Sequence, residues 1–223
     1  MRGYRKNETM IAMLDTSEDL EVCEAEIGCP VEQLLTPLTA FRRKRPDAFF
    51  AIDNGAFSRF NVAAFTGLLD REKEARQLCR FVAVPDVVAS ARRTLEVFRH
   101  WQYQLTAWPL ALVAQDGLED LDIPWKDIAA IFIGGSTAWK MSKDAADVIK
   151  AALAVGKWVH IGRVNTPGRF EYFEDLGAHS IDGSGLARYS WMRERIYRNA
   201  TRPTLFGSGA AEEADRDAAI LSV

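Results

Sequence analysis

The sequence predicts a compact (β/α)₈ barrel, and two features predict it. Short apolar runs rich in β-branched and aromatic residues recur along the chain, with helix-forming stretches between them, which is typical of a parallel sheet built from βα units. Polar residues or glycine follow nearly every run, as they do where the strands of such a barrel end. A doubly wound open sheet is the main architectural alternative.

Eight strands are expected, and the one at Leu20–Cys23 is the weakest candidate. In chain order they are Met10–Leu14, Leu20–Cys23, Ala48–Ile52, Phe81–Val84, Leu110–Ala114, Ala130–Ile133, Trp158–Ile161 and Ala178–Ile181. Helical spacing of apolar residues predicts helices at Val62–Arg76, Val88–Gln104, Asp144–Val155, Arg169–Leu176 and Leu186–Asn199. Such barrels typically have about 250 residues, so a chain of 223 residues must have short loops or missing helices. We assign 1–206 to one barrel domain and 207–223 to a weakly ordered tail.

The composition narrows the class of protein. The chain is 48% hydrophobic and 26% charged, and its apolar runs fall short of the roughly 18 residues that a membrane span needs. The apolar stretch near the N-terminus is interrupted by polar residues, so no secretory signal is expected and we predict a cytoplasmic protein. Three cysteines without a CxxC pair favour neither a disulfide framework nor a thiolate zinc site. A net charge of −3 excludes a nucleic-acid binder that relies on overall positive charge alone.

The residues at the strand ends are the candidates for chemistry. They are Asp53-Asn54-Gly55, Pro85-Asp86, Gln115-Asp116-Gly117, Gly134-Gly135-Ser136, Gly162-Arg163 and Asp182-Gly183-Ser184-Gly185. In a parallel barrel these ends meet at one face, which is where such folds place their active sites. Asp53, Asp86 and Asp182 would share one pocket, where like charges push pKa values apart and separate an acid from a nucleophile. Paired carboxylates suit the chemistry of glycosidic bonds.

The same strand ends resemble those of a known family. The ordered set FAIDNGAF, VAVPDVV, ALVAQDG, FIGGSTAWK, VHIGRV and HSIDGSGLAR is similar to the strand-end series of the tRNA-guanine transglycosylase superfamily. Members of that superfamily are (β/α)₈ barrels that exchange guanine for a 7-deazaguanine. The resemblance runs from about Ala48 to Arg188, and the order and strand context of the motifs carry it.

The resemblance implies a role for each matching residue. Asp182 matches the family's nucleophilic aspartate, and Asp53 matches the aspartate of an Asp-Ser-Gly-Gly-aromatic motif, which acts as general acid and base. Phe57 matches the aromatic residue that stacks on the base, and Ile161 would form the opposite apolar wall. The remaining residues expected to contact the base are Asp86, Gln115, Gly134, Gly135, Ser136 and Gly162.

The departures from the family pattern point to one branch of it. Ala56 replaces the second glycine of the Asp-Ser-Gly-Gly motif, and Gly185-Leu186-Ala187 replaces a Leu-Pro-Thr stretch. The tRNA enzymes carry three zinc-binding cysteines after the last strand, whereas this chain has no cysteine beyond Cys79. A short, zinc-free member resembles the deazapurine DNA-modification (DpdA-like) branch of bacteriophages and bacteria. That branch exchanges guanine in DNA for a 7-deazaguanine such as preQ0.

A basic segment follows the expected nucleophile. Arg163 and the arginines of the segment after Asp182 are candidates for nucleic-acid contacts, namely Arg188, Arg193, Arg195 and Arg198. Tyr189 and Trp191 lie among them and could stack on unpaired bases. Runs of this kind are most often solvated faces, which is the competing interpretation. His160 and His179 lie within expected strands and are read as structural histidines rather than catalytic ones.

The predicted activity is therefore a pentosyltransferase that replaces guanine in DNA with a 7-deazaguanine through a covalent bond between Asp182 and deoxyribose. No cofactor and no metal are expected. The expected partners are DNA, with tRNA as the less favoured substrate, and the free 7-deazaguanine base; a homodimer or partner modification proteins are further possibilities. The alternatives are a tRNA-guanine transglycosylase, a DNA glycosylase-like hydrolase that uses water as acceptor, and a catalytically silent barrel that binds nucleic acid.

Overall fold

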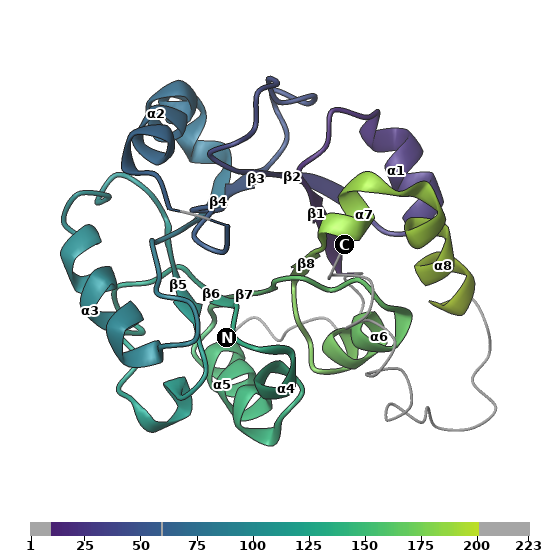
Figure 1. Ribbon diagram of the computed structural model, residues 1–223. Coiled ribbons are helices and arrows are strands. Elements are labelled where there is room, and N and C mark those ends of the chain that lie inside the picture. Colours follow the sequence, from purple (N-terminus) through teal and green to yellow (C-terminus); the bar gives the residue numbers. More distant parts are fainter. Residues whose placement is uncertain (1–9, 59, 201–223) are drawn as a thin grey trace.

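The protein is a closed barrel of eight parallel strands surrounded by helices, as Figure 1 shows in a view along the barrel axis. The computed structural model describes residues 10–58 and 60–200, without the side chains of residues 199 and 200. The strands follow one another around the barrel in sequence order, and β1 (Ile11–Leu14) closes it by pairing with both β2 (Val31–Leu35) and β8 (Ser180–Asp182). The predicted (β/α)₈ fold is thus confirmed, while the predicted tail at 207–223 lies outside the described residues.

The other strands complete the barrel between β2 and β8. They are β3 (Phe50–Ile52), β4 (Cys79–Ala83), β5 (Leu110–Ala114), β6 (Ala130–Ile133) and β7 (Trp158–Ile161). Helices follow most strands: α1 (Leu20–Ile27), α2 (Val62–Glu72) with the 3₁₀ helix η1 (Lys73–Leu78), α3 (Ala91–Trp101), α4 (Thr137–Lys140), α5 (Lys143–Ala154), α6 (Pro167–Asp175), α7 (Ser184–Arg188) and α8 (Ser190–Ala200). Among the residues that the structure describes, no helix is both long enough and apolar enough to cross a membrane.

The chain is short for this fold because two of its crossovers lack an α-helix. The segment between β2 and β3, residues 36–49, is a loop, and the segment between β5 and β6 holds only the 3₁₀ helix η2 (Leu118–Asp120). The expectation of missing helices is therefore confirmed. The buried Gln33 of β2 lies behind the first of these loops. Its amide donates to the carbonyl of Thr16 and accepts from the backbone N–H of Lys44, so it ties the loop to the barrel where a helix would otherwise pack.

One strand of the sequence prediction was placed wrongly. Leu20–Cys23 is not a strand but the start of α1, which begins after the N-cap Asp19 and ends at Gly28 in the left-handed conformation (φ 75°). Leu20, Cys23 and Ile27 form its buried face, with helical spacing. The true second strand is Val31–Leu35, in which two polar residues interrupt the apolar pattern.

Side chains of the strands alternate between two cores, because successive residues of a strand point to opposite faces. Met13, Phe81 and Phe132 belong to the cluster that fills the barrel interior. Ile52 and Ile161 belong to the larger cluster between the barrel and its helices. This alternation decides which residue at each strand end reaches the mouth of the barrel.

Candidate active site

A cavity of about 410 Å³ opens at the C-terminal end of the barrel strands. Its lining includes eight of the residues predicted from the sequence, namely Asp53, Phe57, Asp86, Gln115, Gly134, Arg163, Asp182 and Arg188. Seven of them come from strand ends or the loops that follow them, as expected for an active site in this fold, and Arg188 is the last residue of α7. The volume lies within the range of small-molecule sites, roughly 300–1,000 Å³.

Asp182, the last residue of β8, points into the cavity with its carboxylate held at both oxygens. Oδ1 accepts the backbone N–H of Arg163 at 3.0 Å, and Oδ2 lies 3.0 Å from Nε2 of the buried His160. The side chain is 16% exposed, so it remains accessible from the cavity. The arrangement fixes the orientation of a carboxylate that a ligand can reach.

Asp53, which follows β3, shares the cavity but has a different environment. Burial, together with the negative charges of Asp182 and Asp86, raises its pKa to about 7, and hydrogen bonds from the backbone of Gly55 and Asn54 oppose this rise. A carboxyl group with this pKa can hold a proton near neutral pH and release it. The two carboxylates are therefore suited to different roles, an acid/base group and a nucleophile.

Asp86 follows β4 and is joined to two amide side chains. Its Oδ1 accepts from Asn54 Nδ2 at 2.9 Å, and its Oδ2 accepts from Gln115 Nε2 at 2.7 Å. Gln115 in turn accepts the backbone N–H of Ala89 at 2.9 Å. Burial raises the pKa of Asp86, and the two amide hydrogen bonds oppose that rise. Asp86 and Gln115 thus form one fixed polar wall of the cavity.

Phe57 is the exposed aromatic of the cavity mouth, at 66% exposure. The guanidinium carbon of Arg163 lies 4.4 Å from the centre of its ring. The same guanidinium donates to the carbonyls of Gly134 and Gly135. A planar, hydrogen-bond-donating group therefore already covers one face of the Phe57 ring.

The β6–α4 turn was predicted to read the base with its backbone, and the structure gives this turn other partners. The N–H groups of Gly134 and Gly135 donate to the carbonyl of Ala114, and that of Ser136 donates to Asp116 Oδ1 at 2.6 Å. Ser136 caps α4 through its hydroxyl. Gly134 lines the cavity, whereas Gly135 and Ser136 are not among the lining residues. Their predicted role as donors to a base is not supported by this arrangement.

The structure corrects the predicted role of Ile161. It was expected to form an apolar wall of the base site, but it is fully buried between the barrel and its helices. Its neighbour Gly162 shares the inward face with His160, because side chains alternate along β7. A Cβ at Gly162 would lie 2.6 Å from the ring of Phe132 and 3.5 Å from Asp182 Oδ2, so a glycine is needed for packing beside Asp182. Gly162 supports the site from behind and does not line the cavity.

The arginines after Asp182 divide into two kinds. Arg188 lines the cavity mouth, and Arg195 and Arg198 are exposed. Arg193 is only 1% exposed, and its guanidinium contacts Glu26 at 2.5 Å, Glu18 at 2.6 Å and the carbonyl of Leu186 at 2.6 Å. The prediction that Arg193 lies on a nucleic-acid surface is therefore wrong. Its side-chain contacts hold α8 against α1.

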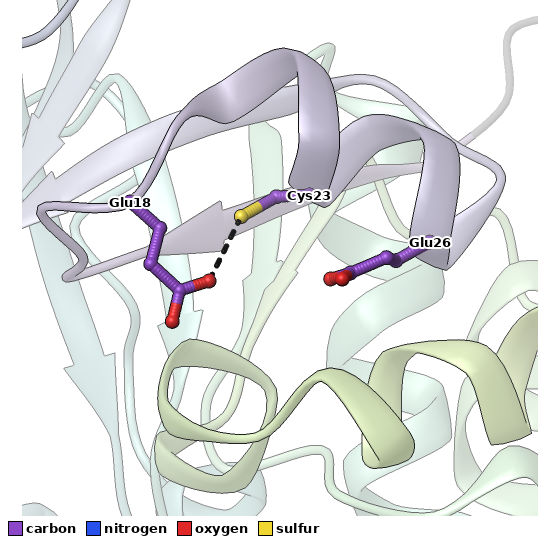
Figure 2. Close-up of side chains that lie close together, drawn as sticks. All are labelled: Glu18, Cys23 and Glu26. Carbon is purple, nitrogen blue, oxygen red and sulfur yellow. Dashed lines mark hydrogen bonds between the residues drawn. The ribbon is translucent and has the colours of Figure 1, made fainter.

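The two carboxylates bound by Arg193 belong to the one group of potential metal ligands found among residues 10–58 and 60–200. Glu18, Cys23 and Glu26 offer ligand atoms within 4.8 Å of one another (Figure 2). The Arg193 guanidinium already binds both carboxylates, and burial raises the pKa of the Cys23 thiol to about 11. A protonated thiol and two arginine-bound carboxylates make a poor metal site, so the cluster is structural.

Three site residues escaped the sequence prediction. Asp15, at the end of β1, lines the cavity and accepts hydrogen bonds from the hydroxyls of Thr36 and Thr39. Lys140 is 3% exposed and donates to the carbonyl of Gly162, and burial lowers its pKa to about 7. His160, interpreted from the sequence as structural, contacts Asp182 directly. Of the three, Asp15 could have been predicted from the sequence, because it directly follows a predicted strand.

Comparison of the chain with models of known families and with curated proteins finds no match. The similarity to the transglycosylase superfamily therefore rests on the strand-end motifs and stays a prediction.

Proposed function

We propose that the protein is a base-exchange glycosyltransferase that acts on nucleic acid, with DNA as the polynucleotide. The observation that supports this most is the pairing of two unlike carboxylates in one cavity. Asp182 is oriented at both oxygens, and Asp53 has a pKa of about 7. The nearby ring of Phe57 offers a stacking face for a flat base.

The proposed reaction is a double displacement. Asp182 attacks C1′ of a target deoxyguanosine, the bond between C1′ and N9 breaks, and its electrons leave with the base, which takes a proton from Asp53. The incoming 7-deazaguanine then gives its N9 proton to Asp53, and N9 attacks C1′. The ester bond breaks and the Asp182 carboxylate is restored.

The size of the cavity requires the target nucleotide to leave the base stack. A volume of about 410 Å³ suits a base with its sugar and not a stacked duplex. The enzyme would therefore flip the nucleotide out or act on single-stranded DNA. In this proposal Arg188, which lines the cavity and is exposed, contacts the flanking phosphates.

The test is exchange of labelled guanine into duplex DNA, single-stranded DNA and tRNA, followed by mass spectrometry of the nucleosides. We expect incorporation into DNA and a protein–DNA adduct that survives denaturation. Preferential labelling of tRNA would overturn the choice of polynucleotide. Release of guanine without incorporation would indicate a hydrolase, and binding without either product would indicate a silent barrel.

A further inference from the structure

A chain of hydrogen bonds runs through the barrel interior and ends at Asp182. Trp158 Nε1 donates to the hydroxyl of Ser180 at 2.8 Å. Ser180 Oγ lies 2.9 Å from His160 Nδ1, and His160 Nε2 lies 3.0 Å from Asp182 Oδ2. Both Ser180 and His160 are fully buried.

The register of two neighbouring strands builds this chain. His160 of β7 pairs directly with Ser180 of β8. Trp158 and His160 on one strand and Ser180 and Asp182 on the other are separated by two residues, so all four side chains point into the barrel. The rings of Phe81 and Phe132 lie with their centres 5.1 and 4.5 Å from that of His160 and restrict its rotation.

The chemistry of the first donor gives the chain a direction. An indole N–H can only donate, so the Ser180 oxygen must accept from Trp158. The Ser180 hydroxyl can then donate to His160 Nδ1, which leaves the imidazole proton on Nε2. That proton points at Asp182 Oδ2. The other neutral tautomer would place a nitrogen lone pair against a carboxylate oxygen, which is unfavourable.

We propose that His160 is a positioning residue, held as the Nε2–H tautomer, that orients the Asp182 carboxylate for attack. This inference rests on the proposed function, in which Asp182 is the nucleophile. His160 holds Oδ2 while the Arg163 N–H holds Oδ1, so the carboxylate plane is fixed relative to the cavity. Misplacing a reacting group by about 1 Å can reduce the rate about 10²-fold, which sets the size of the expected effect.

Two variants separate positioning from simple packing. His160→Gln keeps an N–H group near the position of Nε2, whereas His160→Leu fills the space without a donor. We expect His160→Leu to lower kcat for base exchange by about 10²-fold while KM for DNA changes little, and His160→Gln to retain most of the wild-type kcat. Thermal unfolding of both variants shows whether they fold. A folded His160→Leu variant with wild-type kcat would overturn the proposal.

A spectroscopic measurement tests the tautomer without any assay of activity. In wild-type protein labelled with ¹⁵N at histidine, we expect His160 to show an unprotonated Nδ1 and a protonated Nε2. Protonation at Nδ1 would overturn the proposal even if both variants failed to fold. If the wild-type protein exchanged no base on any substrate while the expected tautomer was observed, the proposed function would fail and the hydrogen-bonded chain would stand.

Discussion

Arg193 is buried and Arg163 is half-buried, and the surroundings of their guanidinium groups differ. The Arg193 guanidinium meets two carboxylates, those of Glu18 and Glu26, between α8 and α1. The Arg163 guanidinium instead donates to backbone carbonyls, while Asp53 in the same cavity keeps a raised pKa. The charged groups between α8 and α1 pair with one another and stabilise the fold. The carboxyl groups at the barrel mouth instead remain accessible to a ligand. The following variants test whether stability and activity separate in this way.

The largest effect on activity is expected from Asp182→Asn. An amide oxygen can still accept the Arg163 N–H, while the amide nitrogen meets the N–H of His160, so thermal unfolding serves as the control for folding. The amide is a poor nucleophile. Loss of a nucleophile typically costs on the order of 10⁴–10⁶-fold in kcat. Trapping of the protein–DNA adduct under denaturing conditions measures this, and an adduct that still formed would place the nucleophile elsewhere.

Asp53→Asn should slow base departure by about 10²–10⁴-fold. In the proposed mechanism the protonated form of Asp53 protonates the leaving base, so the rate of adduct formation in the wild-type protein should fall as pH rises through about 7. The variant should show no such decline. Single-turnover trapping across pH 5 to about 9 measures both, and a wild-type rate that increased over this range would contradict the acid role.

The same variant has a second readout, in stability. The pKa of Asp53 is raised in the folded protein from 3.8 to about 7, so its contribution to stability is fully present below pH 3.8 and is lost as pH rises through 7. Asp53→Asn removes this loss. Relative to the wild type, the variant should therefore gain stability as pH rises from about 4 to 7, by at most about 4 kcal/mol. Urea unfolding at several pH values would show it.

Arg193→Met should lower stability and leave activity unchanged, whereas Asp182→Asn should do the reverse. Removing the guanidinium leaves Glu18 and Glu26 without their shared partner, which should lower the free energy of unfolding by about 2 kcal/mol. The loss is smaller than for a fully buried pair because the Glu18 side chain is 48% exposed. Base exchange below the unfolding transition should be unchanged. Lys143→Met removes an exposed ion pair with Asp147 and serves as the control that should unfold like the wild type. Loss of base exchange in a folded Arg193→Met variant would contradict the assignment of Arg193 to stability alone.

The sequence predicted the barrel and much of its mouth because both follow from local patterns. Apolar runs of strand length mark the strands, and the polar residues after them must meet at one face of a parallel barrel. The second strand was missed because Gln33 is buried there by hydrogen bonds to a loop and not by apolar packing.

Other features depend on contacts that no local pattern reveals. Alternation along β7 says that Ile161 and His160 face opposite ways, but which one faces inward depends on the register with β8. The carboxylates that bind Arg193 lie more than 160 residues earlier in the chain. The local sequence around Arg193 therefore looks like a solvated basic face, although the side chain is buried. The raised pKa of Asp53 arises from burial and from Asp182 on a distant strand.

A smaller effect is expected from Arg163→Ala on binding of the free base. The guanidinium covers one face of the Phe57 ring, so a base that stacks on that face must displace it. A cation–π contact is worth about 0.5–2 kcal/mol, and its removal should therefore tighten binding of guanine by roughly 2- to 30-fold. Phe57→Ala should instead weaken binding. Calorimetric titration with guanine measures both, and weaker binding by Arg163→Ala would mean that its guanidinium contacts the base instead of covering its site.

The smallest effect is expected from the exposed arginines of α8. Replacing Arg195 and Arg198 with alanine should weaken binding of all DNA sequences alike and lower the slope of log affinity against log salt by at most about 2, since each phosphate contact contributes about 0.9. Arg198 already pairs with Glu194 at 2.9 Å, which reduces its contribution. The double replacement of Arg92 and Arg93 removes the same charge from α3, on the other side of the barrel (Figure 1). If α8 contacts the phosphates, only the α8 variant changes the slope; equal slopes in the two variants would mean that net charge alone accounts for the effect and that the basic segment is a solvated face.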